Sequence, residues 1–355
     1  MKVQPVHRGM FSHPDFAGHE TVSFVSDEAS GLKAIIAVHD TTLGPALGGC
    51  RRWAYDGETA ALKDVLRLSR GMTLKNAVAG LDLGGGKAVI LSDGKEATPA
   101  MWHAFGRTVN RLGGDYITAE DVGTGQAAVD AIAEASEHVR GTSAKGLGDP
   151  SPYTAWGVFS GLKAAVKHAL GTDSLDGLTI AVQGTGNVGA DVARLAREDG
   201  ARLILADIRE AAVTALAQEL DASVVAVDQI HAAKADVFAP CALGGALNAK
   251  TIPQLTARVV AGAANNQLDM PEDAARLAER GILYAPDFVI NAGGVISIAL
   301  AEAFPAQEAM RARVGELGTV LSDIFKAADA GEGTTDSIAV RMARARIAAS
   351  RENRC

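Results

Sequence analysis

The 355-residue sequence contains only three cysteines, Cys50, Cys241 and Cys355, which are widely spaced and form no CxxC pair. This scarcity excludes a disulfide-stapled scaffold and a zinc ribbon, and it is typical of a chain in the reducing cytoplasm. The eight histidines form no cluster with metal-ligand spacing, so we expect no bound metal. The sequence therefore predicts a cytoplasmic protein without disulfides or metal.

Long apolar runs and blocks of basic residues are also absent. Asp, Glu or Gly interrupts every apolar stretch before it could span a bilayer, and Met1–Pro5 lacks the apolar region of a secretory signal. The formal net charge is -8 at pH 7, and no basic block stands out. We therefore expect neither a membrane nor a nucleic acid as a partner.

The chain has the length and composition of a two-domain globular protein. Hydrophobic residues make up 48% and charged residues 21% of it, which is ordinary for this class, and 355 residues allow two buried cores. The first part mixes strand and helix patterns without a phosphate-binding turn, and in it we expect a hairpin of strands 21–25 and 32–38 and a short strand over 88–91. We assign residues 1–141 to this N-terminal α/β domain.

A second pattern begins after a segment rich in Gly, Ser and Pro, Gly141–Pro152, which we interpret as a linker. A long helix over Tyr153–Leu170 is followed by apolar strands that alternate with helices, the pattern of a doubly wound parallel sheet. We assign residues 142–330 to this domain and expect the helical residues 331–355 to pack back on the first one. The expected strands are 179–182, 202–206, 223–225, 237–238, 259–260 and 282–284.

A dinucleotide fingerprint, Gly184-Thr185-Gly186-Asn187-Val188-Gly189, follows the first of these strands and opens a helix predicted over Ala190–Arg197. A bare Gly-x-Gly-x-x-Gly match is weak evidence, but this strand and helix context makes it strong. The three glycines permit, in order, a tight turn, close approach of the pyrophosphate, and close packing of helix on strand. The sequence therefore predicts a Rossmann-type domain that binds a nicotinamide dinucleotide at the helix N-terminus.

Asp207 ends the next predicted strand, where an acidic residue would bind the ribose 2′-hydroxyl of the coenzyme. A carboxylate there repels a 2′-phosphate, which favours NAD over NADP, although Arg209 stands close by. The alternative is that Asp207 only caps the end of its strand. Its register with the fingerprint favours the coenzyme role.

The first domain carries a lysine at the end of a triple glycine, Gly84-Gly85-Gly86-Lys87. A P-loop is excluded, because Leu81 stands where its first glycine should be and Ala88 where Ser or Thr should hold magnesium. We expect the glycines to let the backbone approach a cofactor ring or substrate. Near Lys75 and a cationic nicotinamide, Lys87 would have a lowered pKa and could act as a general base toward water. Taken on its own, Lys75 is better explained as an ordinary exposed lysine.

Asp121 lies between a predicted strand, Tyr116–Thr118, and a predicted helix, Gly125–Val139. It could be the N-cap of that helix, a chemical group of the site, or both. The lysines precede the linker and the fingerprint follows it. We therefore expect one domain to hold a nicotinamide coenzyme, the other to present lysines to a small anionic substrate, and the two to close together.

Several blocks of the chain, in the same order, resemble the Glu/Leu/Phe/Val dehydrogenase family, and most of all its leucine-type members. The resemblance spans nearly the whole chain. It implies NAD-dependent oxidative deamination of a branched-chain L-amino acid to the 2-oxo acid, ammonia and NADH, by a homo-oligomer that is at least a dimer. The blocks are Thr42–Gly49, Gly71–Lys75, Gly84–Lys87, Thr118–Thr124, Ala239–Gly244, Ala263–Leu268 and Asn291–Ile296.

The same resemblance implies roles for individual residues. Lys87 is the catalytic lysine, Asp121 exchanges a proton with the amine, and Lys75 pairs with the substrate carboxylate. Gly48 offers its backbone carbonyl to the amino group. The other implied contacts are Asn265 with substrate or nicotinamide, Thr154 and Asn291 with the nicotinamide side, and Leu47, Ala119, Val295 and Ile298 with the substrate side chain.

The four residues of the implied side-chain pocket are all small or aliphatic. An apolar pocket discriminates one methylene by only about 1–3 kcal/mol, so leucine, isoleucine and valine should all be substrates. Phenylalanine, or another aromatic amino acid, is the nearest alternative. A hydroxy-acid dehydrogenase would need a His–carboxylate pair, and no histidine stands beside the lysine blocks. A catalytically silent NAD-binding regulator would be expected to lack Lys87 or Asp121, and both are present.

Overall fold

The computed structural model describes residues 9–242 and 244–353, so the start of the chain, Leu243 and Cys355 lie outside the described residues. The chain divides into two compact units, residues up to Gly148 together with those from Arg344 onward, and Asp149–Ala343. The division falls inside the glycine-rich segment, after residue 148 rather than after residue 141. Each unit contains its own sheet, and the predicted α/β fold class is confirmed.

The sheet of the first unit has the strand order β1-β2-β5-β3-β6, with β4 paired to β5. The predicted hairpin is present as antiparallel β1 and β2, and β5 is antiparallel to β2 but parallel to β3 and β4. The strands are β1 (Thr21–Asp27), β2 (Leu32–Asp40), β3 (Ala46–Leu47), β4 (Cys50–Trp53), β5 (Gly84–Leu91) and β6 (Tyr116–Ile117).

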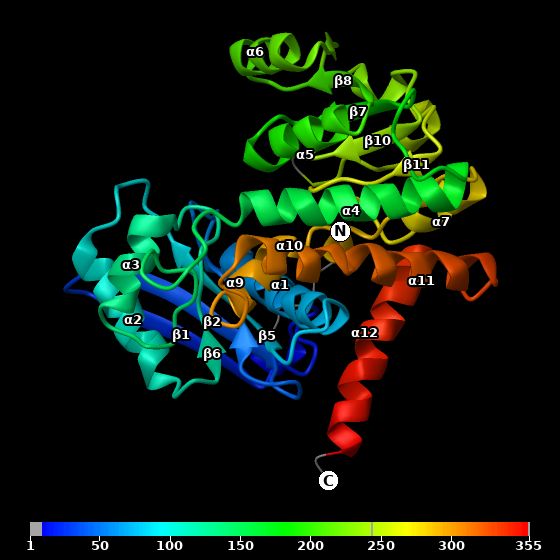
Figure 1. The fold of residues 1–355 in the computed structure, drawn as a ribbon. Helices are drawn as coiled ribbons and strands as arrows, with labels where there is room; N and C mark the ends of the chain where they lie inside the picture. Colours follow the sequence, from blue (N-terminus) through cyan, green and yellow to red (C-terminus); the bar gives the residue numbers. More distant parts are fainter. Residues whose placement is uncertain (1–8, 243, 354–355) are drawn as a thin grey trace, which may run out of the picture. The chain divides into compact units, whose positions relative to one another are not determined.

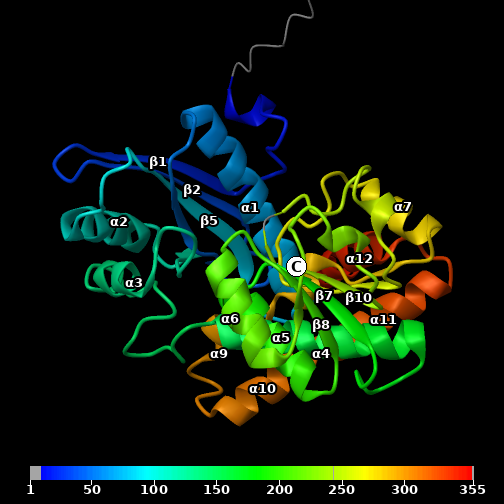
Figure 2. The ribbon, with the colours of Figure 1, turned by 90° about the horizontal axis from the view of Figure 1, so that it is seen from above.

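Helices cover both faces of this sheet, as Figure 2 shows for β1, β2 and β5. One face carries α1 (Glu58–Val78), and the other carries α2 (Pro99–Arg111) and α3 (Gln126–Ala133). A short 3-10 turn, η1 (Met10–Ser12), precedes β1. Each helix packs on the apolar side chains of its own face, so β2 and β5 are buried on both sides, whereas the edge strand β1 is partly exposed.

The two faces of β5 follow the alternation of side chains along a strand. Val89 belongs to the core under α1, whereas Ala88 and Ile90 belong to the core under α2 and α3. Lys87 has the parity of Val89 and therefore points to the α1 face. Cys50 of β4 belongs to the α2–α3 core, so the next residue, Arg51, also points to the α1 face.

Two predicted elements of this unit were wrong in extent. β5 begins at Gly84 instead of Ala88, so the triple glycine is part of the strand. α3 ends at Ala133 instead of Val139, because the chain beyond it turns to pair with the end of β6: the Thr118 nitrogen donates to the His138 carbonyl, and the Arg140 nitrogen to the Thr118 carbonyl.

The second unit is built on a parallel six-stranded sheet with the order β12-β11-β10-β7-β8-β9 (Figure 1). Along the chain this is the strand order of a doubly wound, Rossmann-type sheet, and that prediction is confirmed. The strands are β7 (Thr179–Gln183), β8 (Arg202–Ala206), β9 (Ser223–Val224), β10 (Val237–Pro240), β11 (Val259–Val260) and β12 (Leu283–Tyr284).

Helix α4 (Ser151–Leu170) is the long helix predicted after the linker, and it packs against α5 (Asn187–Glu198) and α11 (Leu317–Asp329). α5 starts at the fingerprint itself, three residues before the predicted start at Ala190. The other helical segments of this unit are α6 (Glu210–Leu220), η2 (Ile230–Ala232), η3 (Ile252–Gln254), α7 (Asp273–Glu279), α8 (Asp287–Ile290), α9 (Gly293–Leu300) and α10 (Gln307–Gly315).

The last helix, α12 (Thr335–Glu352), begins in the second unit and ends in the first. Its final turns are tied to the end of α1: Nη1 of Arg346 donates to the carbonyls of Ala77 at 3.1 Å and Leu81 at 2.6 Å, and Nη2 pairs with Asp82 at 2.7 Å. In the described part of the chain, no helix combines the length and the apolar character needed to cross a membrane.

Candidate active site

Lys87 in β5 and Asp121, in the turn after β6, are in direct contact, with Nζ of the lysine against Oδ2 of the carboxylate. Lys87 is only 6% exposed. The turn is closed by backbone hydrogen bonds between Asp121 and Thr124, and Oδ1 of Asp121 accepts the Val122 nitrogen at 2.6 Å. The first turn of α3 follows Gly125 without a side-chain cap, so Asp121 is not its N-cap.

The surroundings of Lys87 favour the neutral amine. Burial lowers the pKa of Lys87 to about 7, and the neighbouring cations Arg51 and Lys75 act in the same direction. Asp64 opposes this shift, and so does the contact with Asp121, because a nearby carboxylate favours the ammonium form. A lysine with this pKa can take a proton from water at physiological pH.

Lys75 lies in α1, one turn before the end of the helix, and is half-buried. It reaches the face that carries Lys87 because α1 rests directly on β5. A Cβ atom at Gly85 would overlap the backbone nitrogen and Oγ1 of Thr73, and one at Gly84 would overlap the Asp40 carbonyl. The expectation that the triple glycine makes room for a cofactor ring or substrate was wrong: these glycines admit the chain's own backbone.

The backbone at Gly48 is held between β5 and β6. A Cβ atom there would overlap the Gly86 carbonyl, so only glycine fits. The Gly48 carbonyl accepts a hydrogen bond of 2.6 Å from the Tyr116 hydroxyl, and it keeps a second lone pair for another donor. Leu47 and Ala119, the predicted pocket residues of this unit, are both buried.

Arg51, Asp64 and Tyr55 were missed by the sequence analysis. Nη1 of Arg51 donates to Oδ2 of Asp64 at 3.0 Å, the Tyr55 hydroxyl donates to the same oxygen at 2.7 Å, and Nε of Arg51 lies 3.7 Å from Oδ1 of Asp121. The signal that could have found Arg51 is its position just beyond the Thr42–Gly49 block. The four-residue strand that orients it was not recognised.

In the second unit, the fingerprint glycines divide their roles as predicted for a dinucleotide turn. Gly184 has φ +92°, and a Cβ atom there would lie 2.7 Å from that of Ala242; one at Gly189 would overlap the Gly184 carbonyl. Near Gly186, by contrast, a Cβ atom would meet only Nη2 of Arg209, at 3.9 Å. The first and third glycines thus serve the fold, while the second faces open space that a phosphate could enter.

Asp207 follows β8 and accepts hydrogen bonds from Thr185 and Arg209. Oδ2 accepts the backbone nitrogen of Thr185 at 2.6 Å and its hydroxyl at 3.1 Å, and Oδ1 accepts the Arg209 nitrogen at 2.9 Å and Nε at 3.2 Å. Burial raises the pKa of Asp207, but the hydrogen bonds from Arg209 and Thr185 outweigh it and hold the pKa well below its usual range. The carboxylate is therefore anionic at physiological pH.

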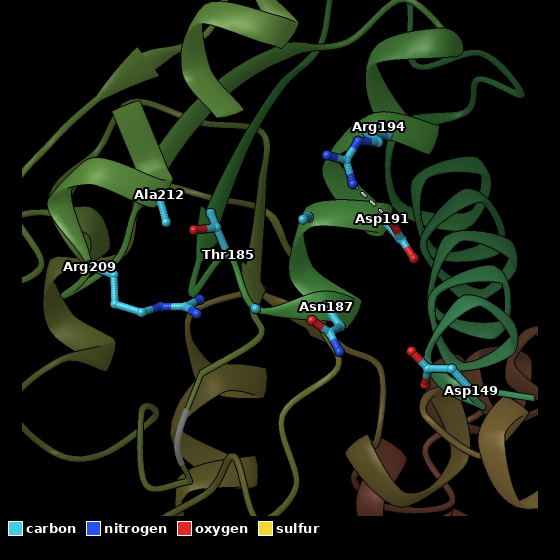
Figure 3. Close-up of a pocket in the computed structure, with 9 residues that line it drawn as sticks. Asp149, Thr185, Asn187, Asp191, Arg194, Arg209 and Ala212 are labelled. Carbon is cyan, nitrogen blue, oxygen red and sulfur yellow. Dashed lines mark hydrogen bonds and ion pairs between the residues drawn. The ribbon is translucent and has the colours of Figure 1, made fainter. Parts of the chain in front are cut away.

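A hollow of about 440 Å³ lies at the N-terminus of α5. Figure 3 shows the Arg209 side chain extending beneath Thr185 toward the start of this helix. Backbone N–H groups at a helix start, an open glycine and a cation together suit the phosphates of a dinucleotide. The lining residues are Asp149, Thr185, Gly186, Asn187, Ala190, Asp191, Arg194, Arg209 and Ala212.

Two further predicted residues of this unit, Asn291 and Asn265, are brought together. Nδ2 of Asn291 donates to Oδ1 of Asn265 at 2.7 Å and to the Ala263 carbonyl at 3.1 Å. Oδ1 of Asn291 is buried and accepts no hydrogen bond from the described residues, which suits the amide N–H of a nicotinamide. On α4, the Thr154 hydroxyl donates to the Pro150 carbonyl at 3.1 Å.

The remaining predicted pocket residues, Val295 and Ile298, lie on α9 and are half-buried. α9 packs closely on α4, since a Cβ atom at Gly294 would come within 2.5 Å of Oγ1 of Thr154. Within residues 9–242 and 244–353, no group of three or more His, Cys, Asp and Glu side chains has the arrangement of a metal site.

Comparisons with known proteins match both units. Residues 19–138 match the family described as Glu/Leu/Phe/Val dehydrogenase, dimerisation domain, and residues 146–207 and 204–328 match Glutamate/Leucine/Phenylalanine/Valine dehydrogenase. Leucine dehydrogenase from Geobacillus stearothermophilus is 48% identical over 349 residues, 97% of this chain and 95% of the relative. Valine dehydrogenase from Streptomyces virginiae is 49% identical over 293 residues, 81% and 82% of the two chains. L-tryptophan dehydrogenase from Nostoc punctiforme is 42% identical in sequence. Its crystal structure matches this chain with a TM-score of 0.83, covering 94% of this chain and 97% of that chain.

Proposed function

Because the chain belongs to the Glu/Leu/Phe/Val dehydrogenase family, whose members are NAD(P)-dependent amino-acid dehydrogenases, we propose that it oxidatively deaminates branched-chain L-amino acids. The products are the 2-oxo acid, ammonia and the reduced coenzyme. The observation that carries the proposal is the contact of the buried Lys87 with Asp121, because this reaction needs a base for water and a proton donor for the amine.

Lys87 is the base in this proposal. When bound, NAD⁺ supplies the acceptor for the hydride that leaves the substrate Cα, and the amino acid becomes an iminium. Nζ of Lys87 then takes a proton from the water molecule that attacks this carbon. Its pKa of about 7 supports the role, because a substantial fraction of the side chain is neutral at physiological pH.

Asp121 moves the proton onward. Its Oδ2 lies against Nζ of Lys87, so a proton can pass from the lysine to the carboxylate without an intervening group. The carboxyl group then donates it to the substrate nitrogen, and Lys87, neutral again, takes the proton of the new hydroxyl group. The C–N bond breaks, the carbonyl forms, and ammonia leaves. The turn between Asp121 and Thr124 holds the carboxylate in position for this exchange.

Lys75 and Gly48 orient the substrate in this proposal. Lys75 pairs with the substrate carboxylate, and its positive charge also helps to lower the pKa of Lys87. The Gly48 carbonyl accepts a hydrogen bond from the substrate amino group with the lone pair that Tyr116 leaves available. The close packing of α1 on β5 supports the assignment of Lys75, because it fixes Lys75 relative to Lys87.

The coenzyme is proposed to be NAD rather than NADP. The anionic Asp207 would accept a hydrogen bond from a ribose 2′-hydroxyl and would repel a 2′-phosphate. The backbone from Gly184 to Gly189 would hold the pyrophosphate, and Asn291, with its unpaired buried oxygen, would hold the carboxamide of the nicotinamide. Thr154 and Asn265 complete the proposed nicotinamide contacts.

An aliphatic side chain is the proposed specificity. The four pocket residues, Leu47, Ala119, Val295 and Ile298, are small or aliphatic, and the similar leucine and valine dehydrogenases are named for such substrates. An aromatic amino acid is the second candidate, since a tryptophan dehydrogenase is 42% identical to this chain.

We also propose that the chain forms a homo-oligomer, at least a dimer. The support is the match of residues 19–138 to a domain described as a dimerisation domain. We propose a cytoplasmic location as well, because the Cys50 and Cys241 thiols are free, as is usual in a reducing compartment.

Product analysis after incubation with L-leucine and NAD⁺ tests the reaction type. Equal amounts of ammonia, 2-oxo acid and NADH are expected. NADH formation from 2-hydroxy acids but not from amino acids would overturn the proposal in favour of a hydroxy-acid dehydrogenase. Tight NADH binding without turnover of either class would indicate a coenzyme-binding regulator.

A further inference from the structure

Arg51 is a cation that connects two carboxylates on the α1 face of the first sheet. β4 runs parallel to β5, with Arg51 opposite Val89, so its side chain emerges on the same face as that of Lys87. Its Nη1 is anchored to Asp64 of α1 at 3.0 Å, and Tyr55 donates to the same carboxylate oxygen. One end of the guanidinium is therefore fixed to the helix that carries Lys75.

The other side of the guanidinium faces Asp121. Nε of Arg51 lies 3.7 Å from Oδ1 of Asp121, which is within reach of an ion pair but too long for a hydrogen bond. This Nε atom is buried and has no hydrogen-bond partner among the described residues. A buried donor that makes no hydrogen bond costs free energy. A carboxylate that turned toward Nε of Arg51 would remove this cost.

The neighbouring Arg52 shows that a buried Nε atom without a hydrogen-bond partner does not by itself indicate a role in the site. Its Nε is also buried without a hydrogen-bond partner. Arg52, however, points to the other face, and its Nη2 donates a hydrogen bond to the Lys95 carbonyl. Within residues 9–242 and 244–353, no carboxylate lies at ion-pair distance from Arg52. What distinguishes Arg51 is therefore its distance to Asp121.

We infer that Arg51 is a positioning residue for the proposed reaction, which gives Asp121 a second cationic partner and thereby keeps Lys87 available as a base. This inference rests on the proposed function, because it assigns Arg51 a role in that reaction. A carboxylate that touched Lys87 alone would hold the lysine as an ammonium ion. Arg51 attracts the carboxylate of Asp121 and repels the ammonium form of Lys87.

Several other charged or titratable groups act on Lys87, and they set the control experiments. Lys75 on α1 repels the ammonium form as Arg51 does, whereas Asp64 on α1 stabilises it. Cys50 on β4 would also stabilise it as a thiolate, but burial raises the pKa of Cys50 to about 12, so the thiol is neutral. Asp121 is the remaining partner, through direct contact.

The test is the pH dependence of kcat/KM in three variants. Arg51→Gln removes the cation, and the acid limb should move up by about one pH unit, with about tenfold less activity near neutral pH and a nearly unchanged plateau. Asp64→Asn removes the opposing anion, so its limb should move down. Arg52→Gln, the adjacent arginine on the other face, should leave the limb where it is.

A second readout does not depend on turnover. The rate at which Lys87 is acetylated at trace level, followed by peptide mapping, reports its neutral fraction at each pH without substrate. The same upward and downward displacements are expected for Arg51→Gln and Asp64→Asn. If the wild-type chain labels in this way but oxidises no amino acid, the proposed function fails while the electrostatic effect of Arg51 stands.

If the acid limb of the pH profile of Arg51→Gln is unchanged, both for labelling of Lys87 and for kcat/KM, the inference is overturned. If Arg51→Gln does not fold, Arg51→Lys and Asp64→Asn decide it. The lysine variant keeps the charge and should keep the wild-type limb. A limb in Asp64→Asn that stays in place or moves up would also overturn the inference.

Discussion

Nζ of Lys87 lies against Oδ2 of Asp121, although the two residues come from different parts of the chain. Lys87 is in β5 and Asp121 follows β6, and the short strand β3 lies between these two strands in the sheet. Lys87 is buried, and burial is the main cause of its lowered pKa. The base and the proton relay that we propose therefore both belong to the first unit.

Replacement of Lys87 tests this pair directly. Lys87→Ala should lower kcat by about 10²- to 10⁴-fold, the range that general acid–base catalysis contributes. NADH binding, measured by fluorescence titration, should be unchanged, since the proposed coenzyme residues belong to the second unit. Lys95→Ala is the matched control, because Lys95 has a side chain that is 84% exposed and pairs only with the exposed Asp93. A Lys87→Ala variant with the wild-type rate would contradict the mechanism.

The pH profile of the wild-type enzyme follows from the pKa of Lys87. That pKa is lowered to about 7, and the neutral form is the active base, so activity is present above this pH and lost below it. Below the limb, log kcat/KM should fall with a slope of about one per pH unit, as for a single protonation. A profile that stays flat well below pH 7 would exclude Lys87 as the base.

The packing of α1 on β5 predicts opposite effects of two glycine substitutions. In Gly85→Ala the new methyl group overlaps Thr73, which should cost about 1–3 kcal/mol of unfolding free energy, as for overpacked cores. In Gly71→Ala, within α1 itself, the methyl group meets nothing within 4 Å, and the variant should gain about 0.5–1 kcal/mol from helix propensity. Urea unfolding measures both. Equal stability of the two variants would contradict this packing.

Coenzyme choice should depend on Asp207. Asp207→Ala removes the negative charge and leaves Arg209 without its carboxylate partner, so the guanidinium can pair with a 2′-phosphate. The ratio of kcat/KM for NADP⁺ to that for NAD⁺ should rise by about tenfold or more, as expected when a like-charge clash costing more than 1 kcal/mol is removed. An unchanged ratio would mean that Asp207 serves only to hold Thr185.

The sequence predicted what is encoded locally. The hairpin of β1 and β2 and the turn from Gly184 to Gly189 each combine a short-range pattern with specific turn residues, and both were predicted correctly. The parallel, doubly wound type of the second sheet was predicted from the alternation of strands and helices.

What the sequence could not predict depends on long-range contacts or very short elements. The close approach of Thr73 explains why residue 85 is glycine, but the two residues touch only because α1 folds back on β5. β3 and β4 are too short to have a readable period, so the orientation of Arg51 could not be inferred. The N-cap alternative for Asp121 could be rejected only once the start of α3 after Gly125 was known.

The most direct test of the whole account is the initial rate of NADH formation with a panel of amino acids. The panel contains leucine, isoleucine, valine, phenylalanine, tryptophan and glutamate, each with NAD⁺ and with NADP⁺. The account predicts fast reduction of NAD⁺ by the three aliphatic amino acids and slow reduction of NADP⁺. Faster turnover of an aromatic amino acid would overturn the assignment of the pocket, and no reduction by any of them would contradict the central claim.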